Sequence, residues 1–224
     1  MIVGERKPLE EIFRMVEPFQ KICLLGCGTC VTVCLAGGDK EVAETAAAIS
    51  LYRKKSGKPV EIVTKTLLRQ CEYEYVDEYL KDMPEVDAVV SMACGAGVQL
   101  LAERLPEKMV LPALNTKFIG YPLEQGVWME NCLACGNCVL DLTGGICPIA
   151  RCSKSMLNGP CGGSQDGKCE IDKNIDCAWH LIYERLQRLG LQARMDEIQP
   201  PKDWSTSHSG GPRKIVREDV RLNG

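Results

Sequence analysis

The chain has 224 residues, of which 45% are hydrophobic, 25% charged and 5% aromatic, which is the composition of a folded protein of one or two domains. Its 27 lysine and arginine residues against 30 aspartate and glutamate residues give a formal net charge of -3. This balance provides no overall positive field to hold a nucleic acid, so we expect no nucleic-acid partner.

Neither a membrane span nor a signal peptide is evident in the sequence. The longest apolar stretch, residues 88–98, is interrupted by Ser91, Gly95 and Gly97 and is shorter than the roughly 18 to 20 residues that a membrane span needs. The N-terminal run MIVGERKPLEEIF mixes acids and bases and lacks the apolar core of a signal peptide. We therefore expect a cytoplasmic protein without a membrane span.

Cysteine is the unusual residue, with 14 copies beside only 2 histidines. Thiols stay reduced in the cytoplasm, so this density indicates metal ligation rather than a framework of disulfides.

Residues 1–20 predict a short amphipathic helix that ends near Pro18 and docks on the body of the protein or on a partner, because apolar residues recur at helical spacing. These residues are Leu9, Ile12, Phe13, Val16 and Phe19.

Residues 21–128 predict an α/β domain, because short apolar strands alternate with helical stretches. We expect strands at 22–25, 60–64, 88–92 and 109–111, and helices at 39–57, 73–81 and 98–105. Four such strands predict a small parallel sheet between helical layers, of the Rossmann or flavodoxin type.

Residues 129–178 carry eight of the fourteen cysteines and little periodicity. A segment of this kind cannot bury an apolar core of its own, so we expect an iron-sulfur module ordered by bonds to metal. Residues 179–224 follow, with a predicted helix and then an extended arm. One face of this helix carries an apolar stripe of Trp179, Ile182, Tyr183, Leu186 and Leu189.

The strongest motif is Cys132-Leu-Ala-Cys135-Gly-Asn-Cys138, the C-x2-C-x2-C spacing that holds three corners of a [4Fe-4S] cluster. In two-cluster ferredoxins a Cys-Pro ligates the other cluster, and Cys147 precedes Pro148. That pattern groups Cys147 with Cys161, Cys169 and Cys177, and leaves Cys152 as the fourth ligand of the first set. Cys147 and Cys152 both remain candidates for the fourth ligand of the cluster held by Cys132, Cys135 and Cys138.

Zinc is the alternative metal, because four thiolates suit it equally well. The C-x2-C-x2-C spacing favours a cluster, since a third cysteine at that step does not easily join the other two on one tetrahedral ion. The spacings of Cys161, Cys169 and Cys177 match no standard pattern, so cluster, zinc and free thiols stay open there.

A second set of thiols belongs to the predicted α/β domain. The run Gly26-Cys27-Gly28-Thr29-Cys30 follows the first strand, and Cys71 and Cys94 follow the second and third. Carboxyl ends of neighbouring parallel strands meet at one crevice, so these four thiols could converge on a metal. Cys34 is an alternate ligand, Cys23 is expected to pack within its strand, and simple core packing of most of these cysteines also remains open.

These residues resemble a known family. The runs GCGTCVTVCLAGG, MACGAGVQ, NCLACGNCVLDLTGGICPIARCSK, LNGPCGGSQDGKCEI and CAWHLIYERL are similar to the small cysteine-rich, MetV-type subunit of methylenetetrahydrofolate reductase. A similar sequence forms the C-terminal region of fused reductases. The resemblance covers nearly the whole chain and implies iron-sulfur clusters and sometimes zinc.

The resemblance implies an electron-transfer subunit that relays electrons through two, or with the strand-end cysteines three, [4Fe-4S] clusters. The expected partners are a flavin-bearing catalytic subunit, which reduces methylenetetrahydrofolate, and a donor such as ferredoxin or a larger electron-donating module. We expect no complete active site in this chain. A zinc-stabilised adaptor of the same complex, and an enzyme whose cluster acts as a Lewis acid, are the alternatives.

Overall fold

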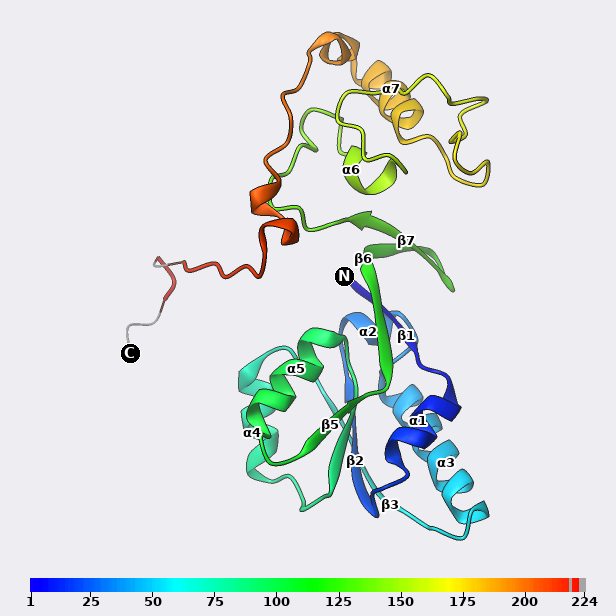
Figure 1. Cartoon of the computed structure of the whole chain (residues 1–224), viewed down its shortest axis with the longest axis vertical. Coiled ribbons are helices and arrows are strands. Elements are labelled where there is room, and N and C mark those ends of the chain that lie inside the picture. Colours follow the sequence, from blue (N-terminus) through cyan, green and yellow to red (C-terminus); the bar gives the residue numbers. More distant parts are fainter. Residues whose placement is uncertain (218, 222–224) are drawn as a thin grey trace. The chain divides into compact units, whose positions relative to one another are not determined.

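A computed structural model describes residues 1–217 and 219–221. It divides into two compact units, Met1–Trp128 and Met129–Gly224, which are described separately (Figure 1).

A four-stranded parallel sheet forms the centre of the first unit. Its strands lie in the order β3-β2-β4-β5, and every pairing is parallel. The bounds are Lys21–Cys27 for β2, Glu61–Leu67 for β3, Ala88–Met92 for β4 and Met109–Pro112 for β5. The prediction of a mixed α/β unit with four parallel strands is confirmed.

Helices cover both faces of this sheet (Figure 1). Alternate residues of β2 point to opposite faces, as strand geometry requires: Leu24 packs in one apolar cluster and Leu25 in the other. Helices α1 and α3 contribute to the first cluster, and helices α4 and α5 to the second. Their bounds are Leu9–Val16 for α1, Asp39–Lys55 for α3, Tyr73–Lys81 for α4 and Gly95–Arg104 for α5, and the four-residue helix α2 spans Cys30–Val33.

The N-terminal segment differs from the single helix predicted over residues 1–20. A strand, β1 (Ile2–Arg6), precedes α1 and pairs antiparallel with β6 (Leu114–Glu124). Strand β7 (Val127–Cys132) completes this second sheet, in the order β1-β6-β7. Ile12 and Val16 of α1 are fully buried, so the helix is part of the core of the first unit.

The second unit has little regular structure in its described residues. Helix α6 (Pro148–Arg151) has four residues, and helix α7 (Ala178–Leu189) ends at Gly190, whose φ of 70° is the left-handed C-cap conformation. Three short 3-10 helices follow at Gln192–Asp196, Trp204–Thr206 and His208–Gly210. The helix predicted after the cysteine-rich segment is confirmed, and its Trp179, Ile182 and Leu186 form a small buried cluster. Tyr183 and Leu189, predicted on the same face, are 46% and 44% exposed, so the buried face is narrower than predicted.

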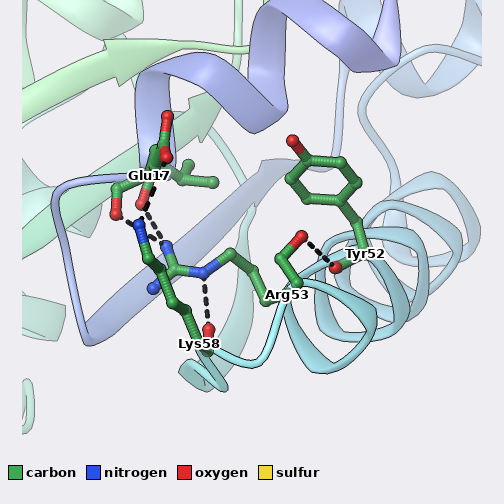
Figure 2. A network of polar contacts seen from close by, with 6 residues as sticks. Glu17, Tyr52, Arg53 and Lys58 are labelled. Atoms are coloured by element: carbon green, nitrogen blue, oxygen red, sulfur yellow. Dashed lines mark hydrogen bonds and ion pairs between the residues drawn. The ribbon is translucent and has the colours of Figure 1, made fainter.

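Arg53 joins α3 to the end of α1 (Figure 2). Its side chain is only 3% exposed. Its Nη1 donates to the carbonyl oxygens of Val16 at 2.7 Å and Glu17 at 3.0 Å, and its Nε donates to the carbonyl of Lys58 at 2.7 Å. Carbonyls at a helix C-terminus have no partner within the helix, so one buried guanidinium satisfies acceptors from two segments.

We predict that Arg53→Met lowers the free energy of unfolding by about 2 to 3 kcal/mol, because buried carbonyl oxygens lose their donors. Lys54→Met, at the exposed next position of the same helix, is the control and should change stability little. Urea unfolding followed by circular dichroism measures both. Equal stabilities for the two variants would contradict the role assigned to Arg53.

Candidate functional site

The loop from Cys132 to Cys138 winds tightly at the end of β7. Ala134 and Gly136 both adopt left-handed backbone conformations, with φ of 50° and 84°. The amide N–H of Ala134 donates to the Cys132 Sγ at 3.3 Å, and the Cys135 thiol donates to the carbonyl of Asn137 at 3.6 Å. Amide donors that face a sulfur favour its thiolate form, so the backbone of this loop suits thiolate ligands.

Cys147 lies at the N-cap of α6, directly before Pro148. Its sulfur accepts a hydrogen bond from the amide of Ala150 at 3.4 Å. The first turn after this cysteine therefore repeats the N–H to sulfur contact seen at Cys132.

Four other cysteines of the second unit line one small cavity of about 20 Å³, which is bounded on one side by Trp179. They are Cys152, Cys161, Cys169 and Cys177. This grouping differs from the pairing favoured by the Cys-Pro pattern, because Cys152 lines the cavity and Cys147 is not among its lining residues. Two basic residues, Arg151 and Lys154, and two acidic residues, Glu170 and Asp176, also line it, and Lys154 forms an ion pair with Glu170.

Polar neighbours surround the Cys169 thiol. Its thiol lies 3.5 Å from the Ser153 Oγ. That hydrogen bond, with smaller contributions from the amides of Ile171 and Asp172 and from the charge of Lys154, holds the pKa of the Cys169 thiol below its usual value.

A third group of thiols lies at the carboxyl edge of the parallel sheet. Cys27 ends β2, and Cys71 and Cys94 follow the two strands that flank it. Burial raises the pKa of the Cys71 thiol, and repulsion from the Cys94 and then the Cys27 thiolates raises it further. Thiolates that repel one another in this way would be stabilised by a bound cation.

Gln70 fixes the loop that carries Cys71. It is fully buried, and its Nε2 donates to the carbonyls of Leu25 at 2.9 Å and Gly26 at 2.8 Å. Its Oε1 accepts from the Ser91 hydroxyl of β4 at 2.6 Å. One side chain thus ties the loop after β3 to strands β2 and β4, and the cysteine spacing gave no signal of this role.

The remaining cysteines of the first unit have other neighbours. Cys30 begins α2. Burial raises the pKa of the Cys34 thiol, and repulsion from the Cys30 thiolate adds to this effect. The Cys34 thiol donates to the carbonyl of Ile2 at 3.6 Å. Cys23 is fully buried, and its Sγ lies 3.1 Å from the Tyr79 hydroxyl oxygen. Burial raises the pKa of the Cys23 thiol and that of the Tyr79 hydroxyl.

The thiols share a cavity or a sheet edge without converging on one point. Among residues 1–217 and 219–221, no group of three or more histidine, cysteine, aspartate or glutamate side chains is set to hold a metal ion. In the same residues, no helix is both long enough and apolar enough to cross a membrane.

Residues 111–205 match the protein family described as methylene-tetrahydrofolate reductase C terminal. The matched segment begins in β5 and ends in the 3-10 helix at Trp204–Thr206. It contains all eight cysteines from Cys132 to Cys177 and none of the strand-end cysteines of the first unit. Comparisons with curated proteins and with solved structures give no match.

We predict that Ser153→Ala raises the pKa of the Cys169 thiol and slows its alkylation at neutral pH several-fold in metal-free protein, because the thiolate is the reactive form. Iodoacetamide labelling between pH 6 and pH 9, quantified by peptide mass spectrometry, measures this change. The profile of Cys169 should move to higher pH, whereas Cys132 in the same samples should keep its profile. An unmoved Cys169 profile would contradict the assigned hydrogen bond.

Proposed function

We propose that this chain is an electron-transfer subunit of a methylenetetrahydrofolate reductase complex. The observation that carries the proposal is the Cys132–Cys138 loop, whose spacing is that of [4Fe-4S] ligands and which lies within the segment matched to the reductase C-terminal family. The left-handed turns and the N–H to sulfur contact of this loop support thiolate ligation.

The fourth ligand of that cluster is Cys147 in this proposal. Cys152, the other candidate, lines the separate cavity with Cys161, Cys169 and Cys177. The sulfur of Cys147 faces the amide of Ala150, and N–H to sulfur contacts of this kind tune the potential of a cluster.

The four cysteines that line the cavity, Cys152, Cys161, Cys169 and Cys177, are the candidates for a zinc site. The spacings of Cys161, Cys169 and Cys177 match no standard cluster pattern. Four thiolates complete a tetrahedral structural zinc site. Metal binding would draw the sulfurs inward and order the loops that carry them.

The strand-end thiols Cys27, Cys71 and Cys94, with Cys30 beside them in sequence, form a third candidate site. Cys71 lies within range of the charges of Cys27 and Cys94. A metal there would have three thiolates from three neighbouring loops, and the loop of Cys71 is held by Gln70.

The residues present indicate which chemistry this chain would supply and which its partner would supply. A [4Fe-4S] cluster supplies one-electron transfer at a potential set by its surroundings. The protein would hold the thiolates and direct amide N–H groups at sulfur, as at Cys132 and Cys147. Reduction of the folate needs a two-electron cofactor, which we assign to the flavin of a catalytic partner subunit. Ferredoxin or a larger electron-donating module would supply the electrons.

A structural adaptor that holds only zinc is the second candidate, and the grouping of four cysteines around one cavity favours it for that site. Such a protein would position its partner without carrying electrons. Metal analysis distinguishes the two functions.

We predict that Cys135→Ser removes about four irons per chain, the content of one cube, and leaves zinc in place. Cys161→Ser should remove zinc and leave the iron. Anaerobic purification with the flavoprotein partner, followed by iron, sulfide and zinc analysis and EPR of the reduced sample, measures both outcomes.

The control is Cys23→Ser, because Cys23 is buried against Tyr79 and should influence neither metal. Wild-type protein that holds zinc and no iron would refute the electron-transfer function and support the adaptor.

A further inference from the structure

The segment from Lys202 to Arg213, here named the C-terminal strap, lies against the Cys132–Cys138 loop. The Thr206 hydroxyl donates to the carbonyl of Cys135 at 2.9 Å. The Arg213 Nη1 donates to the carbonyl of Ala134 at 2.7 Å, and the Lys202 ammonium donates to the carbonyl of Asn137. Three side chains of the strap therefore hold three carbonyls of a loop that lies more than sixty positions earlier in the sequence.

Gly136 permits this close approach. A Cβ atom at this position would lie 2.1 Å from the carbonyl oxygen of Thr206, which is far inside van der Waals contact. The φ of 84° at Gly136 also favours glycine. The middle of the cysteine loop is thus shaped to fit the strap.

The strap has internal structure of its own. Hydrogen bonds from the Ser205 hydroxyl and then from the Ser205 amide, the latter at 2.9 Å, hold the pKa of the Asp203 carboxyl below its usual value. The Ser207 hydroxyl donates to the carbonyl of Trp204 at 2.6 Å, and Ser207 is buried. Arg213 also donates to the carbonyl of Thr206 at 2.9 Å, so the same guanidinium joins the strap to itself and to the loop.

The strap also brings positive charge to the cysteine loop. Lys202 and Arg213 bring two cations to the carbonyls of the loop that carries three thiols. Asp203 is the carboxylate beside them on the strap, and it is engaged by Ser205. Nearby cations stabilise a metal centre more strongly when it carries an additional negative charge.

We propose that the C-terminal strap is a positioning element for the metal-binding loop, in which Arg213, Thr206 and Lys202 fix the loop carbonyls while the two cations raise the reduction potential of the centre. The effect on potential rests on the proposed function. The effect on loop order rests only on the hydrogen bonds described above.

The test compares Arg213→Gln, Arg213→Lys and the control Lys214→Gln in the full chain purified anaerobically with its flavoprotein partner. Lys214→Gln removes the same charge at the exposed adjacent position. The measurements are the rate of iron release to a chelator, the midpoint potential from an EPR-monitored titration, and amide hydrogen exchange of the peptide that covers residues 132–138.

Arg213→Gln should release iron about tenfold faster, the effect expected for one charge-assisted hydrogen bond, and should lower the midpoint potential. Arg213→Lys should keep the potential close to that of the wild type, because the charge is retained. Lys214→Gln should match the wild type in all three measurements. Wild-type behaviour of Arg213→Gln in iron release and potential would overturn the proposal.

Hydrogen exchange of the metal-free chain separates this inference from the proposed function. If the wild type holds no iron, the electron-transfer function fails, but the strap is still tested by exchange. Faster exchange of residues 132–138 in the variant Thr206→Val would then support the positioning role, and unchanged exchange would refute it.

Discussion

The second unit depends on polar contacts to individual sulfur and carbonyl atoms, because it has little apolar surface to bury. Its buried apolar cluster consists of Trp179, Ile182 and Leu186, all on one side of α7. The loops before that helix carry eight cysteines, with amide donors directed at the sulfurs of Cys132 and Cys147. A chain with so small a core needs another source of order, and metal ligation is the source that thiols provide.

The first unit reaches its thiol arrangement by a different route. Its sheet has a full apolar cluster on each face, so strand order alone brings the ends of β2, β3 and β4 to one edge. Gln70 then fixes the loop after β3 by hydrogen bonds to β2 and β4. Cysteines thus lie on two kinds of scaffold. The first unit is ordered by its apolar core, whereas the second would be ordered by a bound metal.

Local signals predicted the parallel sheet well. The strand at 88–92 and the helix at 73–81 have the expected bounds, because apolar runs and helical periodicity are properties of neighbouring residues. Strand β1 was missed because only Ile2 and Val3 of its five residues are apolar, which is too short a run to indicate a strand. Its partner β6, in which Ile119 lies opposite Ile2, was not predicted either. The pairing of the cysteines stays a prediction, because thiol spacing does not encode the paths of the loops. The contacts of the strap had no signal in the sequence, because the strap binds backbone carbonyls, which carry no sequence signature.

We propose that metal–thiolate bonds order the second unit, whereas apolar packing orders the first. Amide hydrogen exchange of the anaerobically purified chain, before and after a chelator strips its metals, tests this most directly. Amides between Cys132 and Cys177 are expected to lose protection on stripping, while those of β2 and β4 keep theirs. Protection between Cys132 and Cys177 that is the same in the metal-bound and the stripped chain would contradict it.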